Sequence, residues 1–188
     1  YFFINKKLNP VLTAETHNFP TLISPFQGAT TGVGGRIRDN QATGTGAIVI
    51  SSLAGYCVGD ISECNLKNYG NYKDPVDILI EASNGASDYG NKFGEPIIGG
   101  FTRSFGMIFN SNERIEWVKP ILFSAGIGAV ADNHTYKKKI QPNMVVIRLG
   151  GPAYKIGMGG GYSSSVNQSS ENCDTDYSAV QRGDPEME

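Results

Sequence analysis

The sequence has few of the residues that mark several common classes of protein. Only three of its 188 residues are cysteines, Cys57, Cys64 and Cys173, and no two form a Cys-x-x-Cys pair. An odd number of irregularly spaced cysteines argues against a disulfide framework and against a structural zinc site. We therefore expect reduced thiols in an intracellular compartment, and we predict a cytoplasmic location.

Positive charge and long apolar runs are also scarce. The formal net charge is -2 at pH 7, so no basic field is available to follow a nucleic-acid backbone. No apolar run approaches the about 20 residues of a membrane span. Residues 1–10 do not have the pattern of a signal peptide. We expect neither nucleic acid nor a membrane as a partner.

The composition otherwise is that of a globular protein. Hydrophobic residues make up 39% and charged residues 18% of the chain, which permits a buried core. A chain of this length fits one large domain, or one domain and part of another. The chain starts without Met and stops where we expect an acidic helix to begin. We expect it to be a fragment of something longer.

Patterns of apolar residues predict the main elements. Val76, Leu79, Ile80 and Ala86 form a helical apolar face behind Asp74 and Pro75, and Gly94 is expected to end that helix. Apolar and β-branched runs predict strands at 10–16, 46–59, 95–109, 120–131 and 144–151, the last being the clearest.

The order of these elements predicts the fold class. Strands and helices mix without strict alternation, which predicts an α+β domain. A charged turn at 133–143 lies in the expected domain boundary, residues 132–143, and a second glycine-rich tract follows at 150–165. The polar segment 59–74 is expected to be an exposed insertion or loop.

The segment Gly28–Asp39, "GATTGVGGRIRD", is expected to be a loop that leads into a helix N-terminus. Such a loop can direct several backbone N–H groups at one anion. It matches neither a Walker loop nor a clean GxGxxG fingerprint, and glycines also build ordinary turns. Arg38 could clamp a phosphate and Asp39 could bind Mg²⁺, although a surface ion pair is an alternative.

The short run from Glu15 to Asn18 follows a predicted strand, a place from which catalytic side chains commonly project. His17 could act as a general base or could stabilise a developing oxyanion. A purely structural role is the alternative for this histidine, and His134 is expected to be solvated. Asp184, in a Gly-Asp-Pro turn, could join Glu15 and Asp39 as a metal ligand.

Several long motifs carry a family resemblance. They are "ETHNFPTLISPFQGATTGVGGRIRD", "SNGASDYGNKFGEPIIGGFTRSFG", "KPILFSAGIG", "GGPAYKIGMGGG" and "AVQRGDPEME". Together they resemble the large form of the phosphoribosylformylglycinamidine synthase family, over nearly the whole chain after Val11. The resemblance implies an aminoimidazole-ribonucleotide-synthetase-like N-terminal domain at 1–140. The start of a C-terminal α/β domain is then expected at 141–188.

The same resemblance implies an activity. Formylglycinamide ribonucleotide, ATP and glutamine-derived ammonia would yield formylglycinamidine ribonucleotide, in the fourth step of de novo purine biosynthesis. The implied cofactors are ATP and Mg²⁺. The implied partners are a glutaminase domain that supplies ammonia and a second synthetase half, both elsewhere in the full-length chain. This fragment alone is expected to be inactive.

The resemblance also assigns roles to individual residues. His17 is the implied catalytic residue, and Thr16, His17, Asn18 and Arg38 are the implied substrate contacts. The implied Mg²⁺ ligands are Glu15, Asp39 and Asp184. The implied nucleotide-phosphate segment consists of Gly28, Ala29, Thr30, Thr31, Gly32, Val33, Gly34, Gly35, Arg36, Ile37, Arg38 and Asp39.

Two departures and two alternatives accompany this resemblance. Phe19 stands where bacterial members have a second His, and Thr13 stands where many have a Lys that contacts ATP. The His-Asn-Phe-Pro form resembles the eukaryotic branch. One alternative is a structural half that holds a nucleotide without turnover. The other is a different ATP-dependent member of the same fold group, such as a thiamine-phosphate kinase or a selenophosphate synthetase.

Overall fold

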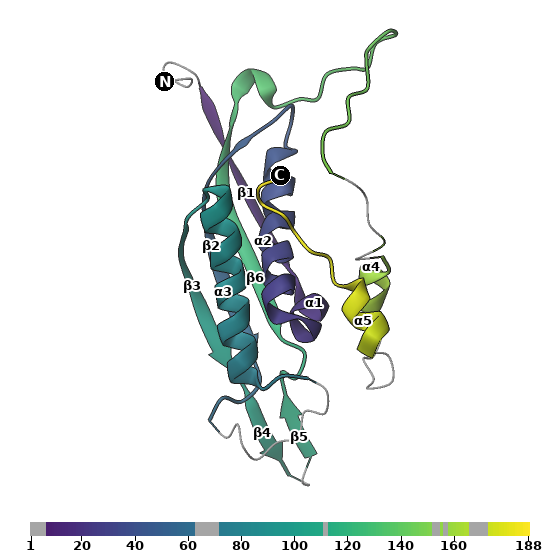
Figure 1. The fold of residues 1–188 in the computed structure, drawn as a ribbon. Helices are drawn as coiled ribbons and strands as arrows, with labels where there is room; N and C mark the ends of the chain where they lie inside the picture. Colours follow the sequence, from purple (N-terminus) through teal and green to yellow (C-terminus); the bar gives the residue numbers. More distant parts are fainter. Residues whose placement is uncertain (1–6, 63–71, 111–112, 152–154, 156–157, 166–172) are drawn as a thin grey trace.

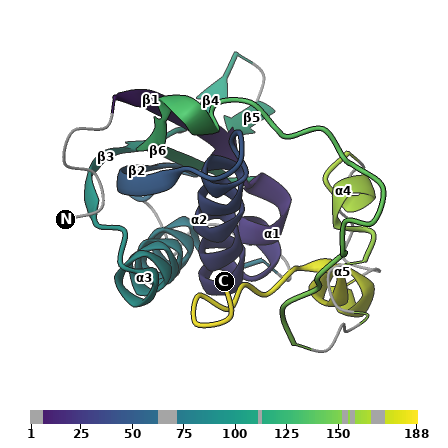
Figure 2. The same cartoon turned by 90° about the horizontal axis from the view of Figure 1, so that it is seen from above.

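The fold is a four-stranded sheet with helices on one face (Figures 1 and 2). The computed structural model describes residues 7–62, 72–110, 113–151, 155, 158–165 and 173–188. The strands are β1 (Leu8–Thr16), β2 (Ile48–Val58), β3 (Ile97–Ser104) and β6 (Ile121–Ala131), in the order β1-β6-β2-β3. Strand β6 is antiparallel to both neighbours, whereas β2 and β3 are parallel. The predicted α+β class is confirmed.

Three helices cover the inner face of the sheet. They are α1 (Asn18–Ile23), α2 (Pro25–Gln41) and α3 (Pro75–Phe93). Helix α3 begins behind Asp74 and ends at Gly94, whose φ of 95° is left-handed, as the sequence predicted. It connects the two parallel strands, as a crossover between parallel strands requires. Its buried face joins α2 and the sheet in the main core.

Helix α2 corrects the prediction made for the glycine-rich segment. Gly28–Asp39 was expected to be a loop, but it lies entirely within this helix. A glycine inside a helix costs about 0.5–1 kcal/mol relative to alanine, so local propensity does not explain the helix. Tertiary packing does, because the glycines let other groups approach closely. A Cβ on Gly34, for example, would lie 2.6 Å from the Tyr89 hydroxyl.

The strand predictions at 10–16, 46–59 and 120–131 are confirmed, and 95–109 divides into β3 and β4 (Gly106–Phe109). The sequence did not predict β5 (Glu113–Glu116), which pairs with β4. The strand predicted at 144–151 is wrong, because residues 144–149 form neither strand nor helix. Val146 there is 95% exposed. A strand needs a neighbouring strand for its backbone hydrogen bonds, and none of the described residues pairs with this segment.

Some predictions lie only partly within the described residues. The expected loop at 59–74 has no helix or strand before Pro75 in its described part, while 63–71, including Cys64, lie outside it. The second glycine-rich tract contains α4 (Gly160–Ser163), and α5 (Cys173–Ala179) follows it. A short 3-10 helix, η2 (Asp132–His134), ends the β6 segment. Cys57 is a free thiol.

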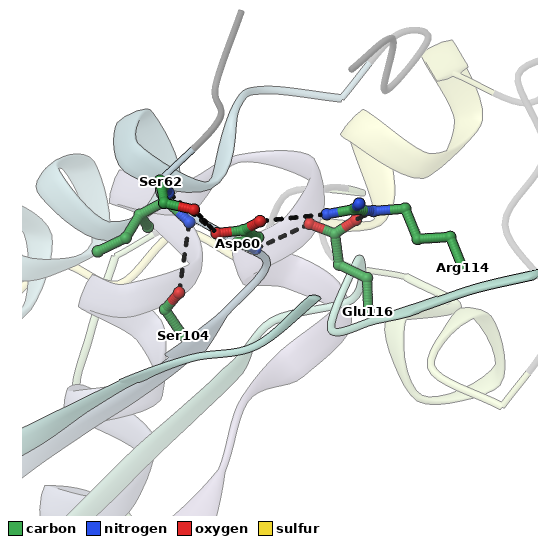
Figure 3. A network of polar contacts seen from close by, with 6 residues as sticks. Asp60, Ser62, Ser104, Arg114 and Glu116 are labelled. Atoms are coloured by element: carbon green, nitrogen blue, oxygen red, sulfur yellow. Dashed lines mark hydrogen bonds and ion pairs between the residues drawn. The ribbon is translucent and has the colours of Figure 1, made fainter. Parts of the chain in front are cut away.

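A polar network fixes the β4–β5 hairpin to the sheet (Figure 3). Asp60 follows the end of β2. Its backbone N–H donates to Glu116 Oε1 at 2.8 Å. Arg114 donates from Nε to Glu116 Oε2 at 2.6 Å and lies 3.3 Å from Asp60 Oδ2. Asp60 also accepts from Ser62, and the Ile61 N–H donates to the Ser104 hydroxyl at the end of β3. These contacts join β2, β3 and the hairpin at one end of the sheet.

The outer face of the sheet carries exposed apolar side chains. Leu12 is 78% exposed, and its partner across the β1–β6 ladder, Ile127, is 45% exposed. Leu53 and Phe101 extend this surface across β2 and β3. No described helix is long and apolar enough to span a membrane. An apolar sheet face of this kind favours association with another surface.

We expect the chain on its own to self-associate through this outer face. Leu12→Lys places a charge there and should shift the population toward monomer, because burying an unpaired charge is costly. Ile80→Lys on α3, where the native side chain is 53% exposed, is the matched control and should not change association. Sedimentation velocity measures both. A monodisperse monomer of the unmodified chain would show that this expectation is wrong.

Candidate functional site

The end of β1 presents two predicted site residues to opposite faces of the sheet. Strand β1 alternates in exposure from Leu8 to Thr16, so adjacent side chains point in opposite directions. Glu15 faces α2, because a Cβ on Gly35 would lie 3.0 Å from its Oε1. Thr16 is exposed and belongs to the other face. The predicted substrate contact Thr16 and the predicted metal ligand Glu15 therefore do not point the same way.

His17 is held from three sides where β1 meets α1. Its backbone N–H donates to the Leu122 carbonyl at 2.9 Å, and its own carbonyl accepts from the Thr21 hydroxyl at 2.5 Å. Its Nδ1 lies 2.6 Å from the Gly28 carbonyl oxygen. A carbonyl only accepts, so Nδ1 carries the hydrogen in this contact. In the neutral ring, Nε2 then carries the lone pair.

Burial keeps this ring neutral. The pKa of His17 lies below its usual value, first because burial disfavours the charged form and also because Arg38 is positively charged. The Gly28 hydrogen bond opposes this shift. In this tautomer Nε2 accepts a proton, whereas the hydrogen on Nδ1 is engaged with the Gly28 carbonyl. Of the two roles that the sequence left open, this geometry favours the general base.

Glu15 lies in one electrostatic environment with Asp39 and the two arginines of α2. Burial raises the pKa of Glu15, and the charge of Asp39 raises it further, whereas Arg38 and Arg36 lower it. Two carboxylates that repel one another fit a divalent cation, and Mg²⁺ usually binds protein through one or two carboxylates. Glu15 and Asp39 are two such carboxylates, and their role as Mg²⁺ ligands stays a prediction.

Asp184 does not join this pair in the chain as described. It lines the cleft described below together with Asp88 and Lys92 of α3. Among the described residues, no group of three or more His, Cys, Asp or Glu side chains could hold a metal ion. The expected convergence of Glu15, Asp39 and Asp184 around one point is therefore absent from this chain, and the metal role of Asp184 stays a prediction.

The two arginines of α2 have different environments. Arg36 is fully buried, and its Nη1 donates to Glu95 Oε1 at 2.9 Å while Nη2 pairs with Glu95 Oε2. Arg38 is exposed and bonds Glu188 at 2.8 Å. Within an α-helix most backbone N–H groups donate one turn back, so this segment cannot form a backbone phosphate cradle. Of these two arginines, only Arg38 is exposed enough for a ligand to reach it.

A cleft of about 1160 Å³ lies between α2, α3 and residues 181–188. Thr31 joins α2 to that last segment, because its hydroxyl donates to the Gln181 carbonyl at 2.8 Å and accepts from the Gly183 N–H at 3.1 Å. Thr30, Thr31 and Arg38 line the cleft, as do Asp88 and Lys92 of α3. Its volume is large enough for a nucleotide. Its lining carries three cations and four carboxylates, and two of the cations, Arg38 and Lys92, pair with Glu188 and Asp88. His17 and Glu15 lie outside this lining.

Sequence reasoning missed three residues that organise this region. Glu95 neutralises Arg36, Tyr89 donates to the Glu188 carboxylate, and Glu188 also pairs with Arg38. Burial and the Glu188 contact raise the pKa of Tyr89. The glycines around Tyr89 were the available signal. Gly85 lies against the backbone of Phe26, and Gly34 lies against the Tyr89 ring.

The chain belongs to the family described as AIR synthase related protein, N-terminal domain, which matches residues 2–130. It is 53% identical to "Phosphoribosylformylglycinamidine synthase" of Homo sapiens over 95% of the chain, and 54% identical to the protein of that name in Dictyostelium discoideum over 94%. The resemblance drawn from the sequence is confirmed. The chain spans 14% of the length of each of these relatives.

The fold also resembles solved structures. "T. maritima PurL complexed with FGAR" aligns with a TM-score of 0.64 at 22% identity, over 98% of this chain and 26% of that one. At this identity the likeness establishes the fold. Another relative, 51% identical over 97% of the chain, is "Probable phosphoribosylformylglycinamidine synthase, chloroplastic/mitochondrial" of Arabidopsis thaliana, 14% of which is covered.

The buried ion pair leads to a stability prediction. Arg36→Met leaves the Glu95 carboxylate buried without its partner, which should lower the free energy of unfolding by about 3–5 kcal/mol. Arg38→Met, two residues along the same helix but exposed, should cost less than about 1 kcal/mol. Urea denaturation followed by circular dichroism measures both. Equal losses for the two variants would contradict the structural role assigned to Arg36.

Proposed function

We propose that this chain forms part of the synthetase region of a phosphoribosylformylglycinamidine synthase. Ammonia would replace the formamide oxygen of formylglycinamide ribonucleotide, at the expense of ATP. The names of the relatives support the reaction, and the contact between His17 Nδ1 and the Gly28 carbonyl at 2.6 Å carries the assignment of a base. ATP supplies the phosphoryl group that makes the amide oxygen a leaving group.

His17 would accept a proton during this substitution. Once the ammonia nitrogen has bonded to the formamide carbon, it carries a surplus proton that must leave. The Nε2 lone pair of a neutral His17 is suited to take it, since Nδ1–H is engaged with Gly28. The partial burial of the ring keeps it unprotonated and ready for this step.

Arg38 and the cleft would bind the charged groups of the substrates. A guanidinium can make two parallel hydrogen bonds to a phosphate, and Arg38 lines the cleft together with Thr30 and Thr31. Asn18 is a further substrate contact in this proposal, because its side-chain oxygen is buried without a hydrogen-bond partner among the described residues. Glu15 and Asp39 would hold Mg²⁺, which neutralises phosphate charge.

The remaining partners belong to the proposal as well. Ammonia would come from a glutaminase domain elsewhere in the full-length chain, and a second synthetase half would complete the enzyme. A cytoplasmic location also remains our proposal. The division into domains at residue 140 stays a prediction. A structural half that only holds a nucleotide is less well supported, because such a role gives no reason for a half-buried histidine whose Nδ1 is fixed by the Gly28 carbonyl.

His17→Ala in the full-length enzyme tests this proposal. Loss of one positioned catalytic group typically lowers turnover by about 10²- to 10³-fold, and we expect that loss here. Glutamine hydrolysis should remain chemically competent, and ribonucleotide binding should fall much less, since Arg38 is intact. His134→Ala removes the other histidine of this chain and serves as the control. Near-normal turnover of His17→Ala would return His17 to a structural role.

Arg38→Gln tests the binding role separately. Removing a charged hydrogen-bond donor should raise the KM for the ribonucleotide by about 10- to 100-fold, with a smaller change in kcat. Lys73→Gln removes an exposed charge that pairs with Glu81 at the start of α3, and should leave KM unchanged. Steady-state kinetics of the full-length enzyme give both constants. An unchanged KM for Arg38→Gln would exclude this contact.

A further inference from the structure

Gly32 lies against the candidate base. It is one helical turn after Gly28 on α2, so the two glycines share the face of the helix that meets His17. A Cβ on Gly32 would lie 2.9 Å from His17 Cβ and 3.3 Å from His17 Cγ. It would also lie 2.8 Å from Leu122 Cδ2, within the core. Real Cβ atoms do not approach other carbons this closely, so something would have to move.

Rotation of the imidazole cannot relieve this clash. The histidine atom nearest to the added Cβ is the His17 Cβ, whose position the backbone sets. That backbone is held by hydrogen bonds to the Leu122 carbonyl and from the Thr21 hydroxyl. The start of α2 is equally confined, because a Cβ on Gly28 would overlap the backbone of Pro20. Helix α2 would therefore have to retreat from the end of β1. The Gly28 carbonyl would retreat with it.

We propose that Gly32 is a positioning residue for His17. Its missing Cβ lets α2 lie close enough for the Gly28 carbonyl to accept from His17 Nδ1, which fixes the ring and leaves Nε2 free. This inference rests on the proposed role of His17 as the base. It assigns the glycine-rich sequence of α2 a mechanical task in place of a backbone phosphate cradle.

Gly32→Ala in the full-length enzyme tests the inference. A misplaced catalytic group can cost about 10- to 100-fold in rate, and we expect a fall in kcat of that size with little change in the KM for the ribonucleotide. Gly90→Ala is the matched control, because its Cβ would meet the Glu95 carbonyl oxygen at 2.8 Å, away from His17. That variant should lose stability and keep its kcat. Equal falls in kcat for the two glycine variants would overturn the inference.

A double-mutant cycle separates positioning from general damage. In a His17→Ala background the ring is absent but the Cβ remains, so Gly32→Ala should still lower the melting temperature and should lower kcat no further. If Gly32→Ala lowers kcat equally in both backgrounds, Gly32 does not act through His17 and the inference fails. If His17→Ala alone leaves kcat unchanged, the proposed role of His17 as the base is wrong, and the inference about Gly32 fails with it.

A second variant serves if Gly32→Ala does not fold. Leu122→Val added to Gly32→Ala shortens the side chain that the new Cβ meets in the core, but leaves the clash with His17 in place. The double variant should regain stability while kcat stays low, with Leu122→Val alone as its reference. Recovery of kcat together with stability would show that core packing, and not the position of His17, was the cause.

Discussion

The close approach of α2 to its neighbours is the constraint on which the rest of the structure depends. Four glycines in the middle of one helix weaken it locally, and tertiary contact must compensate. Gly28 admits the backbone of α1, Gly32 admits His17, and Gly34 admits the Tyr89 ring of α3. The same absence of side chains that lets the helix pack also holds the candidate base at the end of β1.

A buried ion pair between α2 and the sheet is a second constraint on how these elements pack. Arg36 enters the core between the helix and the sheet, and Gly126 of β6 leaves room for its guanidinium. Glu95, at the junction between α3 and β3, neutralises it. A buried pair of this kind specifies one arrangement of elements, because a shift of either element would leave a buried charge without its partner. Arg38, two residues later, lies on the outer side of the helix, where it is exposed and pairs with Glu188.

Local patterns predicted much of the fold. Runs of β-branched residues indicated β1, β2 and β6, and the Pro75 start and Gly94 end of α3 follow from chain chemistry that acts within a few residues. The glycine-rich segment failed because its apparent loop chemistry is overridden by contacts with α1, β6 and α3. The run at 144–149 has strand-forming residues but no described partner strand, so composition alone could not make it one.

The sequence by itself determined which side chains could do chemistry: Glu15, His17, Arg38 and Asp39 were identifiable from their types and spacing, and long motifs pointed to the family. Only the tertiary structure decided their states. It enclosed Arg36 with Glu95 and exposed Arg38, it set the His17 hydrogen on Nδ1, and it left Asp184 in the lining of the cleft, apart from the other two predicted metal ligands. Burial, charge pairing and hydrogen-bond direction depend on groups that are distant in the chain, so no local pattern contains them.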